Sequence, residues 1–457
     1  MKTHRLFLAL VSWGLAACQE LPQPSSFSVH GGFLRDSLGR IVVLRGVNLS
    51  TEHKKPPYVG WHKAADFQKL SGWGFHSVRF LISWAALAPK PGVFDDNYLN
   101  EVEIRLNWAR EAGLSVVLDM HQDVFGEGFG HNGAPRWACD EAKYAEHKKL
   151  EPWFLQYASP PVRDCFDRLW TDPALISAFV SAWRRVAERF ASRPEVLGFD
   201  ILNEPSPGNA DLRDFEADLL LPFYLRVIDE VRQAAPHWVA FVEPSNTRNL
   251  GIPTKLPTLD RANVVYAPHS YDALAEQGKG FDPAHRAALL MNVSELADEA
   301  RRMNAALWIG EYGGNEQHPG ITEYMDAQYD AAALAGAGSM YWDGSRGPGY
   351  GLFENDGTEK TKLFSALVRP YPRYVSGNAL SFSFDENTSC MTTTYEPTGT
   401  APTVLFVPKT VYPNGYFVCC TDCQYEKGET ELTVLAPPNS TPTSITICKK
   451  ACANPSE

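Results

Sequence analysis

Two glutamates follow short apolar runs of the kind that form buried strands. Glu204 lies in FDILNEPSPG and Glu311 lies in LWIGEYGG. A single glutamate in such a place is more often a solvated residue or half of an ion pair. Two that meet at one rim of a barrel can divide the work of glycoside hydrolysis, in which one protonates the leaving oxygen and the other attacks the anomeric carbon. We therefore predict that Glu204 and Glu311 form a catalytic pair. The separation of the two carboxylates distinguishes a retaining from an inverting reaction.

Further polar and aromatic side chains stand at or just inside the ends of other apolar runs. They are Arg79, His121, Asp123, Asn203, His269, Tyr271 and Trp342. An arginine buried inside the barrel would cost free energy as an unpaired charge, so it needs a carboxylate partner. We expect Glu311 to be that partner, kept ionised by Arg79 and by a hydrogen bond from Tyr271. The charge of Glu311 and partial desolvation should raise the pKa of Glu204.

Eight apolar runs supply the strands that would position these side chains. They begin at Ile41, Ser77, Ser115, Val196, Trp238, Asn263, Ala306 and Ser339. Amphipathic stretches such as NYLNEVEIRLNWAREAG lie between them. This alternation predicts an α/β fold, and eight units favour a closed (β/α)8 TIM barrel over an open sheet. The leading segment FSVHGGFLRDSLGRIVVLRG is typical of a hairpin, which could cover the barrel floor.

The sequence changes character after Pro370, where Thr, Ser, Pro and Cys become frequent and short strands such as TVLFV and SITIC replace helical patterns. This indicates a C-terminal all-β, sandwich-like domain. We expect the barrel to span residues 27–370 and this disulfide-rich domain to span residues 371–457. Its six cysteines, whose pairing the sequence leaves open, are Cys390, Cys419, Cys420, Cys423, Cys448 and Cys452, while Cys139 and Cys165 flank a separate segment.

The N-terminus carries Lys2 and Arg5, then an apolar stretch, and reaches LAAC at Cys18. This pattern resembles a bacterial lipoprotein signal, which predicts a signal peptide over residues 1–17, a lipidated Cys18 and a tether over residues 18–26. The alternative is an ordinary cleaved signal with an incidental cysteine. Both alternatives predict an exported protein, and the first predicts membrane association through Cys18.

Composition and missing motifs narrow the range of functions. The formal net charge of −12 repels phosphate backbones, so no nucleic-acid partner is expected. The sequence contains no G-x-S-x-G elbow, H-E-x-x-H pair or phosphate-binding loop, so no metal or organic cofactor is expected. Nothing in the sequence predicts an oligomeric state.

The motifs GVNL, VRF, DMHQD, ILNEP, HSY, GEYG and YWDG, in this order, resemble glycoside hydrolase family 5. Within that family KKPPY, DMHQDVF and HNGAPRWA are similar to the endoglycoceramidase branch. The resemblance implies a retaining endo-β-glycosidase that cuts between an oligosaccharide and ceramide, so that a glycolipid or oligosaccharide is its substrate. The alternatives are a related enzyme acting on other glycolipids or on β-glucan or mannan, and a carbohydrate-binding protein without catalysis.

The resemblance also assigns roles residue by residue. Glu204 would be the acid/base and Glu311 the nucleophile, supported by Arg79 and His269. Asn203 would hold the sugar 2-OH. The sugar at the cleavage site would be bound by His121, Asp123, Tyr271 and Lys54, with Lys55 as an alternative to Lys54, and Trp342 would stack beneath it. Glu243 could be a ligand or a structural carboxylate.

The segment from residue 124 to residue 172 departs from the family's pattern. Arg136 stands where related enzymes often carry an acidic residue, and a long insertion runs from Cys139 to Cys165. Its aromatic and apolar residues include Trp137, Trp153 and Tyr157. They could pack onto the barrel or line a groove for lipid tails.

Overall fold

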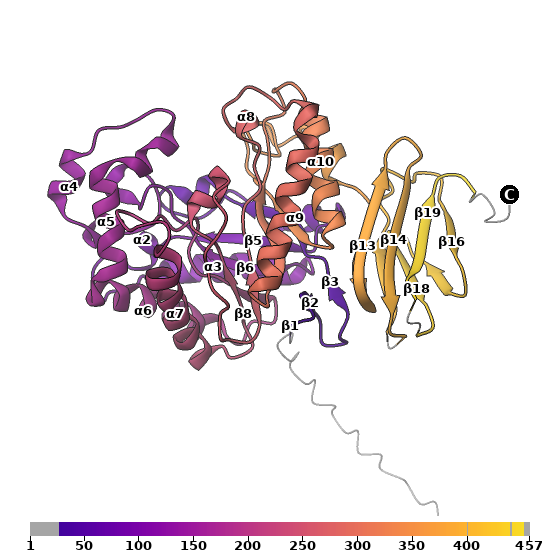
Figure 1. Ribbon diagram of the computed structural model, residues 1–457, viewed down its shortest axis with the longest axis horizontal. Coiled ribbons are helices and arrows are strands. Elements are labelled where there is room, and N and C mark those ends of the chain that lie inside the picture. The colour runs from indigo at the N-terminus through magenta and orange to yellow at the C-terminus, as the bar shows by residue number, and fades with distance from the viewer. Residues whose placement is uncertain (1–26, 400, 439–440, 452–457) are drawn as a thin grey trace, which may run out of the picture.

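The computed structural model describes residues 27–399, 401–438 and 441–451. The predicted signal peptide, the tether with Cys18, and Cys452 lie outside the described residues. Figure 1 shows a barrel surrounded by helices and, beside it, a smaller domain built of strands. In the described part of the chain, no helix is both long and apolar enough to cross a membrane.

The larger unit is a closed barrel of eight parallel strands, which confirms the predicted fold class. In chain order they are β4 (Arg45–Leu49), β5 (Ser77–Ile82), β6 (Ser115–Met120), β7 (Val196–Asp200), β8 (Val239–Val242), β9 (Val264–Tyr266), β10 (Ala306–Tyr312) and β11 (Gly338–Tyr341). The main surrounding helices are α1 (Ala64–Gly72), α3 (Asp96–Glu111), α6 (Pro173–Phe190), α7 (Leu221–Ala234), α9 (Arg286–Arg302), α10 (Ile321–Leu334) and α11 (Thr361–Leu367). Shorter elements between them are η1 (Thr51–Lys54), α2 (Trp84–Leu87), η5 (Glu216–Leu220), η6 (Asn246–Leu250), α8 (Ala273–Glu276) and η7 (Pro283–His285).

Local sequence explains where these elements begin. All six residues of β5 are buried, because a barrel strand packs against the interior on one face and against helices on the other. Helix α6 begins after Asp172, whose carboxylate accepts hydrogen bonds from the backbone of Ala174 and Leu175, and Pro173 fills the first helical position. Asp95 caps α3 in the same way. These caps fix where the loops that follow β6 and β5 end and their helices begin.

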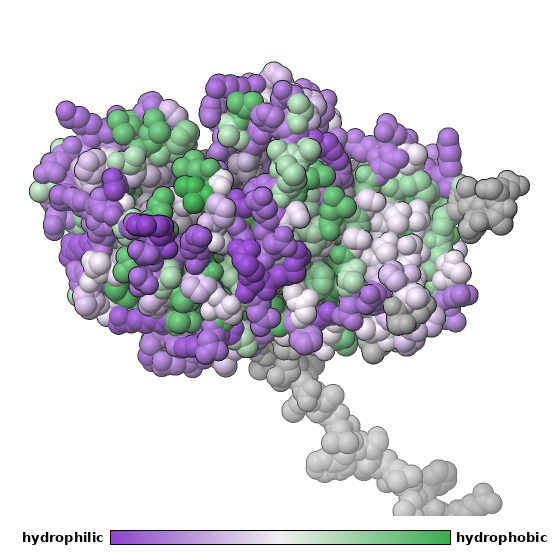
Figure 2. All heavy atoms as spheres, viewed as in Figure 1, coloured by the Kyte–Doolittle hydropathy of each residue, from purple (hydrophilic) through white to green (hydrophobic). Residues whose placement is uncertain are grey.

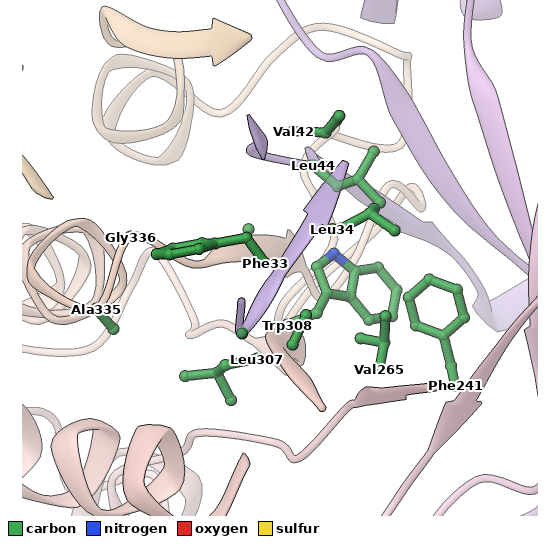
Figure 3. A pocket seen from close by; sticks show the side chains of 13 residues that line it. Phe33, Leu34, Val42, Leu44, Phe241, Val265, Leu307, Trp308, Ala335 and Gly336 are labelled. Carbon is green, nitrogen blue, oxygen red and sulfur yellow. The ribbon is translucent and has the colours of Figure 1, made fainter. Parts of the chain in front are cut away.

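The N-terminal segment closes the barrel floor, as predicted. Its strands are β1 (Ser28–His30), β2 (Phe33–Arg35) and β3 (Ile41–Val42). Leu34 and Val42 pack with Phe241 and Trp308 from the barrel interior, and these side chains line the small pocket drawn in Figure 3. The prediction of a single strand from Ile41 was wrong. The chain pairs first with the C-terminal domain as β3 and then enters the barrel as β4.

The C-terminal domain consists of two antiparallel sheets over a common core, as the sequence predicts. Its strands are β12 (Tyr371–Val375), β13 (Gly377–Asp385), β14 (Cys390–Pro397), β15 (Thr403–Phe406), β16 (Phe417–Cys420), β17 (Gln424–Lys427), β18 (Glu431–Leu435) and β19 (Thr443–Cys448). The first sheet runs β1-β2-β3-β12-β15-β18-β17 and the second runs β13-β14-β19-β16. The N-terminal hairpin thus belongs to this domain's first sheet as well as to the barrel floor.

Disulfides secure both units. Cys139 pairs with Cys165, Cys390 with Cys448 and Cys420 with Cys423, and Cys419 is also disulfide-bonded. The Cys139–Cys165 bond ties together the insertion after β6, which folds into η2 (Glu127–Phe129), η3 (Arg136–Ala138), α4 (Glu141–Glu146), η4 (Trp153–Ala158) and α5 (Pro160–Thr171).

Candidate active site

Glu204 lies four residues beyond the end of β7 in an unusual backbone conformation. Its φ of +42° is uncommon for a residue with a side chain. Neighbouring strands hold this backbone in place, because the Glu204 N–H donates to the Glu243 carboxylate (2.8 Å) and Gln122 donates to the Glu204 carbonyl (3.0 Å). Prolines follow directly in NEPSP, where the chain turns, and the Glu204 carboxylate reaches His269 and Asn249 at the mouth of the barrel.

Glu311 lies in β10 and is held from two sides. Its Oε1 accepts a hydrogen bond from Arg79 Nη1 (2.8 Å), and its Oε2 accepts one from the Tyr271 hydroxyl (3.0 Å). These are the partners predicted from the sequence. Burial raises the pKa of Glu311, while the positive charges of His269 and Arg79 oppose that rise. The Glu311 side chain is 6% exposed, whereas that of Glu204 is 16% exposed.

The two carboxylates are close enough for direct attack on a substrate. One oxygen of Glu204, one oxygen of Glu311 and one nitrogen of His269 all lie within 4.8 Å of one another. Retaining glycosidases place their carboxyl groups about 5–5.5 Å apart, and inverting enzymes need about 6.5–9.5 Å to admit a water molecule. The geometry fits the retaining arrangement.

Arg79 is the fully buried centre of this network. It forms ion pairs with Asp119, Asp200, Glu243 and Glu311, at 2.8–3.0 Å. Although burial alone would lower the pKa of Arg79, these carboxylates raise it well above its usual value. Burial also raises the pKa of Asp119, of Asp200 and of Glu243, the last to about 7. Glu243, whose role the sequence left open, therefore anchors Arg79 and the Glu204 backbone from within the protein.

His269 connects the two candidate catalytic glutamates. Its Nδ1 lies 2.8 Å from Glu204 Oε1 and 3.6 Å from Glu311 Oε2, and its Nε2 lies 3.4 Å from Glu243 Oε1. Burial would lower the pKa of His269, but these carboxylates raise it well above its usual value, which favours the protonated imidazole. The sequence analysis expected His269 to support Glu311, but its shorter contact is with Glu204.

The predicted rise in the pKa of Glu204 is wrong, because this pKa lies below its usual value. Burial does raise this pKa, but the hydrogen bond and charge of His269, the hydrogen bond from Asn249 (2.7 Å) and the charge of Lys54 outweigh burial and lower it. The contact between Glu204 and His269 therefore favours a carboxylate at Glu204 and an imidazolium at His269.

The residues expected to bind sugar lie together beside this pair. Lys54 Nζ donates to Asp123 (2.7 Å) and lies 4.4 Å from the centre of the Trp342 ring. The His121 ring stacks on Trp342, with 5.3 Å between their centres, and its Nδ1 is 2.7 Å from Asp119. Asn203 accepts a hydrogen bond from Arg79 (3.0 Å) and donates to the Gln122 carbonyl (3.1 Å). The structure thus brings together every predicted site residue that it describes.

Several functional contacts were not predicted from the sequence. Asn249, in η6, is hydrogen-bonded to Glu204, and Asp119 and Asp200 are the inner partners of Arg79. Two groups of three side chains also have metal-ligand spacing: Glu204, His269 and Glu311, and Asp119, Asp200 and Glu243. Arg79 already forms ion pairs with Glu311 in the first group and with all three carboxylates of the second.

Two different family models match this chain, one over the barrel and one over the C-terminal domain. Residues 36–347 match the family described as cellulase (glycosyl hydrolase family 5). Residues 369–447 match the glycoside hydrolase family 5 C-terminal domain.

Comparison with individual proteins gives relatives over most of the chain. Endoglycoceramidase I of Rhodococcus hoagii is 28% identical over 421 residues, covering 86% of this chain and 82% of that protein. The structure of endo-glycoceramidase II from Rhodococcus sp. in complex with ganglioside GM3 superimposes with a TM-score of 0.81 at 31% identity, covering 92% of this chain and 99% of that one. The lactosyl-enzyme intermediate of the same enzyme gives a TM-score of 0.80, also at 31% identity, covering 92% of this chain and 100% of that one.

Proposed function

This chain belongs to glycoside hydrolase family 5, and we propose that within the family it is a retaining endo-β-glycosidase that hydrolyses the bond between glycan and ceramide in glycosphingolipids. The observation that carries the catalytic part is the close approach of Glu204 and Glu311, within 4.8 Å, with Glu311 held by Arg79 and Tyr271. The substrate part is supported by the two endoglycoceramidases described above.

In the first step, the Glu311 carboxylate attacks the anomeric carbon while the glycosidic bond to the leaving oxygen breaks. The leaving oxygen takes a proton from Glu204, which draws on the proton shared with His269 at 2.8 Å. The charge of Arg79 and the hydrogen bond from Tyr271 keep Glu311 ionised until it attacks.

In the second step, a water molecule attacks the same carbon from the side that the leaving group has vacated. Glu204, now ionised, accepts the proton of this water, and the Glu311 carboxylate is released. The two inversions together retain the configuration of the sugar. Lys54, Asp123, His121 and Trp342 hold the sugar ring through hydroxyl contacts and stacking, and Asn203 binds its 2-OH.

A soluble β-glucan or mannan is the second candidate substrate, since the matched barrel family is described as cellulase. The test is product analysis on a panel of glycosphingolipids and soluble glucans, with Glu311→Gln as the inactive control. We expect release of intact oligosaccharide together with ceramide. Hydrolysis of a glucan with no cleavage of any glycolipid would refute the proposed substrate class while leaving the chemistry intact.

A further inference from the structure

Exposed apolar side chains at the catalytic face are concentrated along one arc of the rim. Leu150, Trp153 and Leu155 follow β6, Leu212 follows β7, and Leu250 and Ile252 follow β8, with Val93 after β5 beside them. Leu250 is 75% exposed and Trp153 is 42% exposed. Among the described residues, no large apolar side chain is exposed in the loops between β9 and α9, β10 and α10, β11 and α11, or β4 and α1. We call the set from Leu150 to Ile252 the apolar arc.

The order of the strands makes this arc continuous. Strands β6, β7 and β8 are hydrogen-bonded neighbours in the barrel, so the loops that leave their carboxyl ends are adjacent at the rim. Figure 2 shows this face hollowed between the segment that carries α4 and α5 and the segment that carries α8, with apolar side chains gathered near α4 and α5.

Glu204 lies at the middle of the arc. On one side, Asn249 donates to Glu204 Oε1, and the next residue is Leu250. On the other side, the Trp153 ring lies 6.4 Å from that of Tyr157, whose hydroxyl accepts a hydrogen bond from Gln122, and Gln122 also binds the Glu204 carbonyl. Leu250 thus adjoins a residue in direct contact with Glu204, and Trp153 is linked to Glu204 through three successive contacts.

We infer that the apolar arc docks the enzyme onto a lipid–water interface, the surface of a bilayer or micelle, so that the leaving group remains in the lipid during cleavage. The inference rests on the proposed function. Docking on the side next to Glu204, where the leaving group lies, would serve the reaction only if that leaving group is a lipid. Exposed tryptophan and leucine side chains on adjacent loops are the means by which proteins lie on such interfaces.

The charges near the arc indicate how docking would respond to salt. Both signs flank Leu150 and Trp153, with Lys148 and Lys149 balanced by Glu146 and Glu151, and Lys149 lies 3.4 Å from Glu151. A balanced charge gives no net attraction to anionic headgroups. Docking should therefore persist on uncharged lipid and be insensitive to ionic strength.

The test compares two paired variants with a matched control. Trp153→Ser with Leu155→Ser, and Leu250→Ser with Ile252→Ser, each remove part of the arc. Met291→Ser with Leu334→Ser removes equally exposed apolar side chains from the outer helices α9 and α10. All proteins, including the reference called wild type here, carry Cys18→Ser in the full chain, so that an N-terminal lipid cannot hold them on the vesicles. The measurements are flotation with phosphatidylcholine vesicles that lack glycolipid, kcat/KM on glycosphingolipid in such vesicles, and kcat/KM on a soluble aryl glycoside.

We expect each arc variant to lose at least about tenfold in vesicle flotation and in kcat/KM on vesicle glycolipid. Turnover of the soluble aryl glycoside should not change, and the Met291 and Leu334 control should match the wild type throughout. Flotation that is unchanged in the arc variants, or reduced equally in the control, would overturn the inference. It would also be overturned if the wild type sedimented as a dimer and the arc variants as monomers with unchanged flotation, since the arc would then join two copies.

These outcomes separate the two proposals. A wild type that floats through the arc but cleaves no glycosphingolipid refutes the proposed substrate and leaves docking supported. A wild type that cleaves glycosphingolipid, with arc variants that float and cleave equally well, supports the substrate and refutes docking.

Discussion

At the scale of single residues, the two glutamates of the site lie in different environments although their side chains are chemically identical. Glu311 is buried against Arg79 and Tyr271, whereas Glu204 is more exposed and contacts His269 and Asn249. Glu311 thus keeps a fixed cation, Arg79, that opposes the rise in its pKa caused by burial, whereas Glu204 shares a hydrogen bond with His269, a group that can give up a proton. This asymmetry separates a nucleophile from an acid/base.

Substitution of each glutamate should show the difference. Glu311→Gln removes the nucleophile and should abolish turnover of every substrate. Glu204→Gln removes only proton transfer, so it should slow glycolipid cleavage by about 10²–10⁴-fold while sparing glycosylation by aryl glycosides whose leaving group needs no proton. The measurement is steady-state and burst kinetics on both substrate types. Equal losses for the two variants on the activated aryl glycoside would show that the roles are assigned wrongly.

The pH profile should depend on His269. Glu311 must be ionised, so activity falls as pH drops through its pKa, which burial raises and His269 helps to hold down. The Glu204–His269 pair must keep its proton, so activity falls as pH rises through the pKa of the pair, which the raised pKa of His269 places high. In His269→Gln the acid limb should move to higher pH and the alkaline limb to lower pH.

The test is to measure kcat/KM against pH for the wild type, for His269→Gln and for the control His285→Gln. The pH range of activity should be narrower in His269→Gln than in the wild type. His285 contacts Asp272 rather than either glutamate, so its variant should keep the wild-type profile. An alkaline limb that stays in place or moves to higher pH in His269→Gln would contradict a shared proton.

At the scale of elements, one side chain joins β5 to four other barrel strands and to the residue that follows β8. Arg79 on β5 binds carboxylates that belong to β6, to β7 and to β10, and Glu243 directly after β8. Asn48 on β4 also accepts a hydrogen bond from it (3.1 Å). The position of Glu311 therefore depends on the same contacts that hold the barrel interior together.

Removal of this cation should cost both stability and activity. Arg79→Met leaves several buried carboxylates without their counter-charge, so we expect the free energy of unfolding to fall by about 3–5 kcal/mol. Arg184→Met removes only exposed ion pairs, to Glu188 and Glu230, and should leave the free energy of unfolding close to that of the wild type. Chemical denaturation followed by tryptophan fluorescence measures the free energy of unfolding of both variants. A stable Arg79→Met protein with normal activity would contradict the central role of Arg79.

The elements and the outer part of the site could be predicted from sequence, and the inner contacts could not. The eight strands are visible because doubly buried strands are continuous apolar runs. The division of Ile41–Leu49 into two strands has no turn residue to mark it, since VVLR carries neither glycine nor proline. Asp119 and Asp200 lie among apolar strand residues. Their role as partners of Arg79 is visible only once the three-dimensional position of Arg79 is known. The distance from Asn249 to Glu204 depends on the path of a loop.

At the scale of the whole molecule, the barrel and the sandwich share structure at the floor, opposite the catalytic face. Strands β1, β2 and β3 join the sandwich sheet, while Leu34 and Val42 fill the barrel end. Tyr329 of α10 packs in the sandwich core. The C-terminal domain thus stabilises the closed end of the barrel and leaves the rim with Glu204 free to meet substrate.

We propose that Cys18 is lipidated after cleavage of residues 1–17, which would hold the enzyme beside a membrane where glycolipids reside. Mass spectrometry of the mature protein should find an acylated N-terminal Cys18, and Cys18→Ser should release the protein from the membrane fraction. An unmodified N-terminus at another residue would argue for an ordinary secreted form.

The most direct test of the catalytic assignment is to trap the glycosyl-enzyme with a 2-fluoro sugar that carries an activated leaving group and to map the labelled peptide. The account predicts one label per molecule, on the carboxylate of Glu311, and a product whose anomeric configuration is retained when the intermediate turns over. A label on a peptide that lacks Glu311, or a product of inverted configuration, would contradict it.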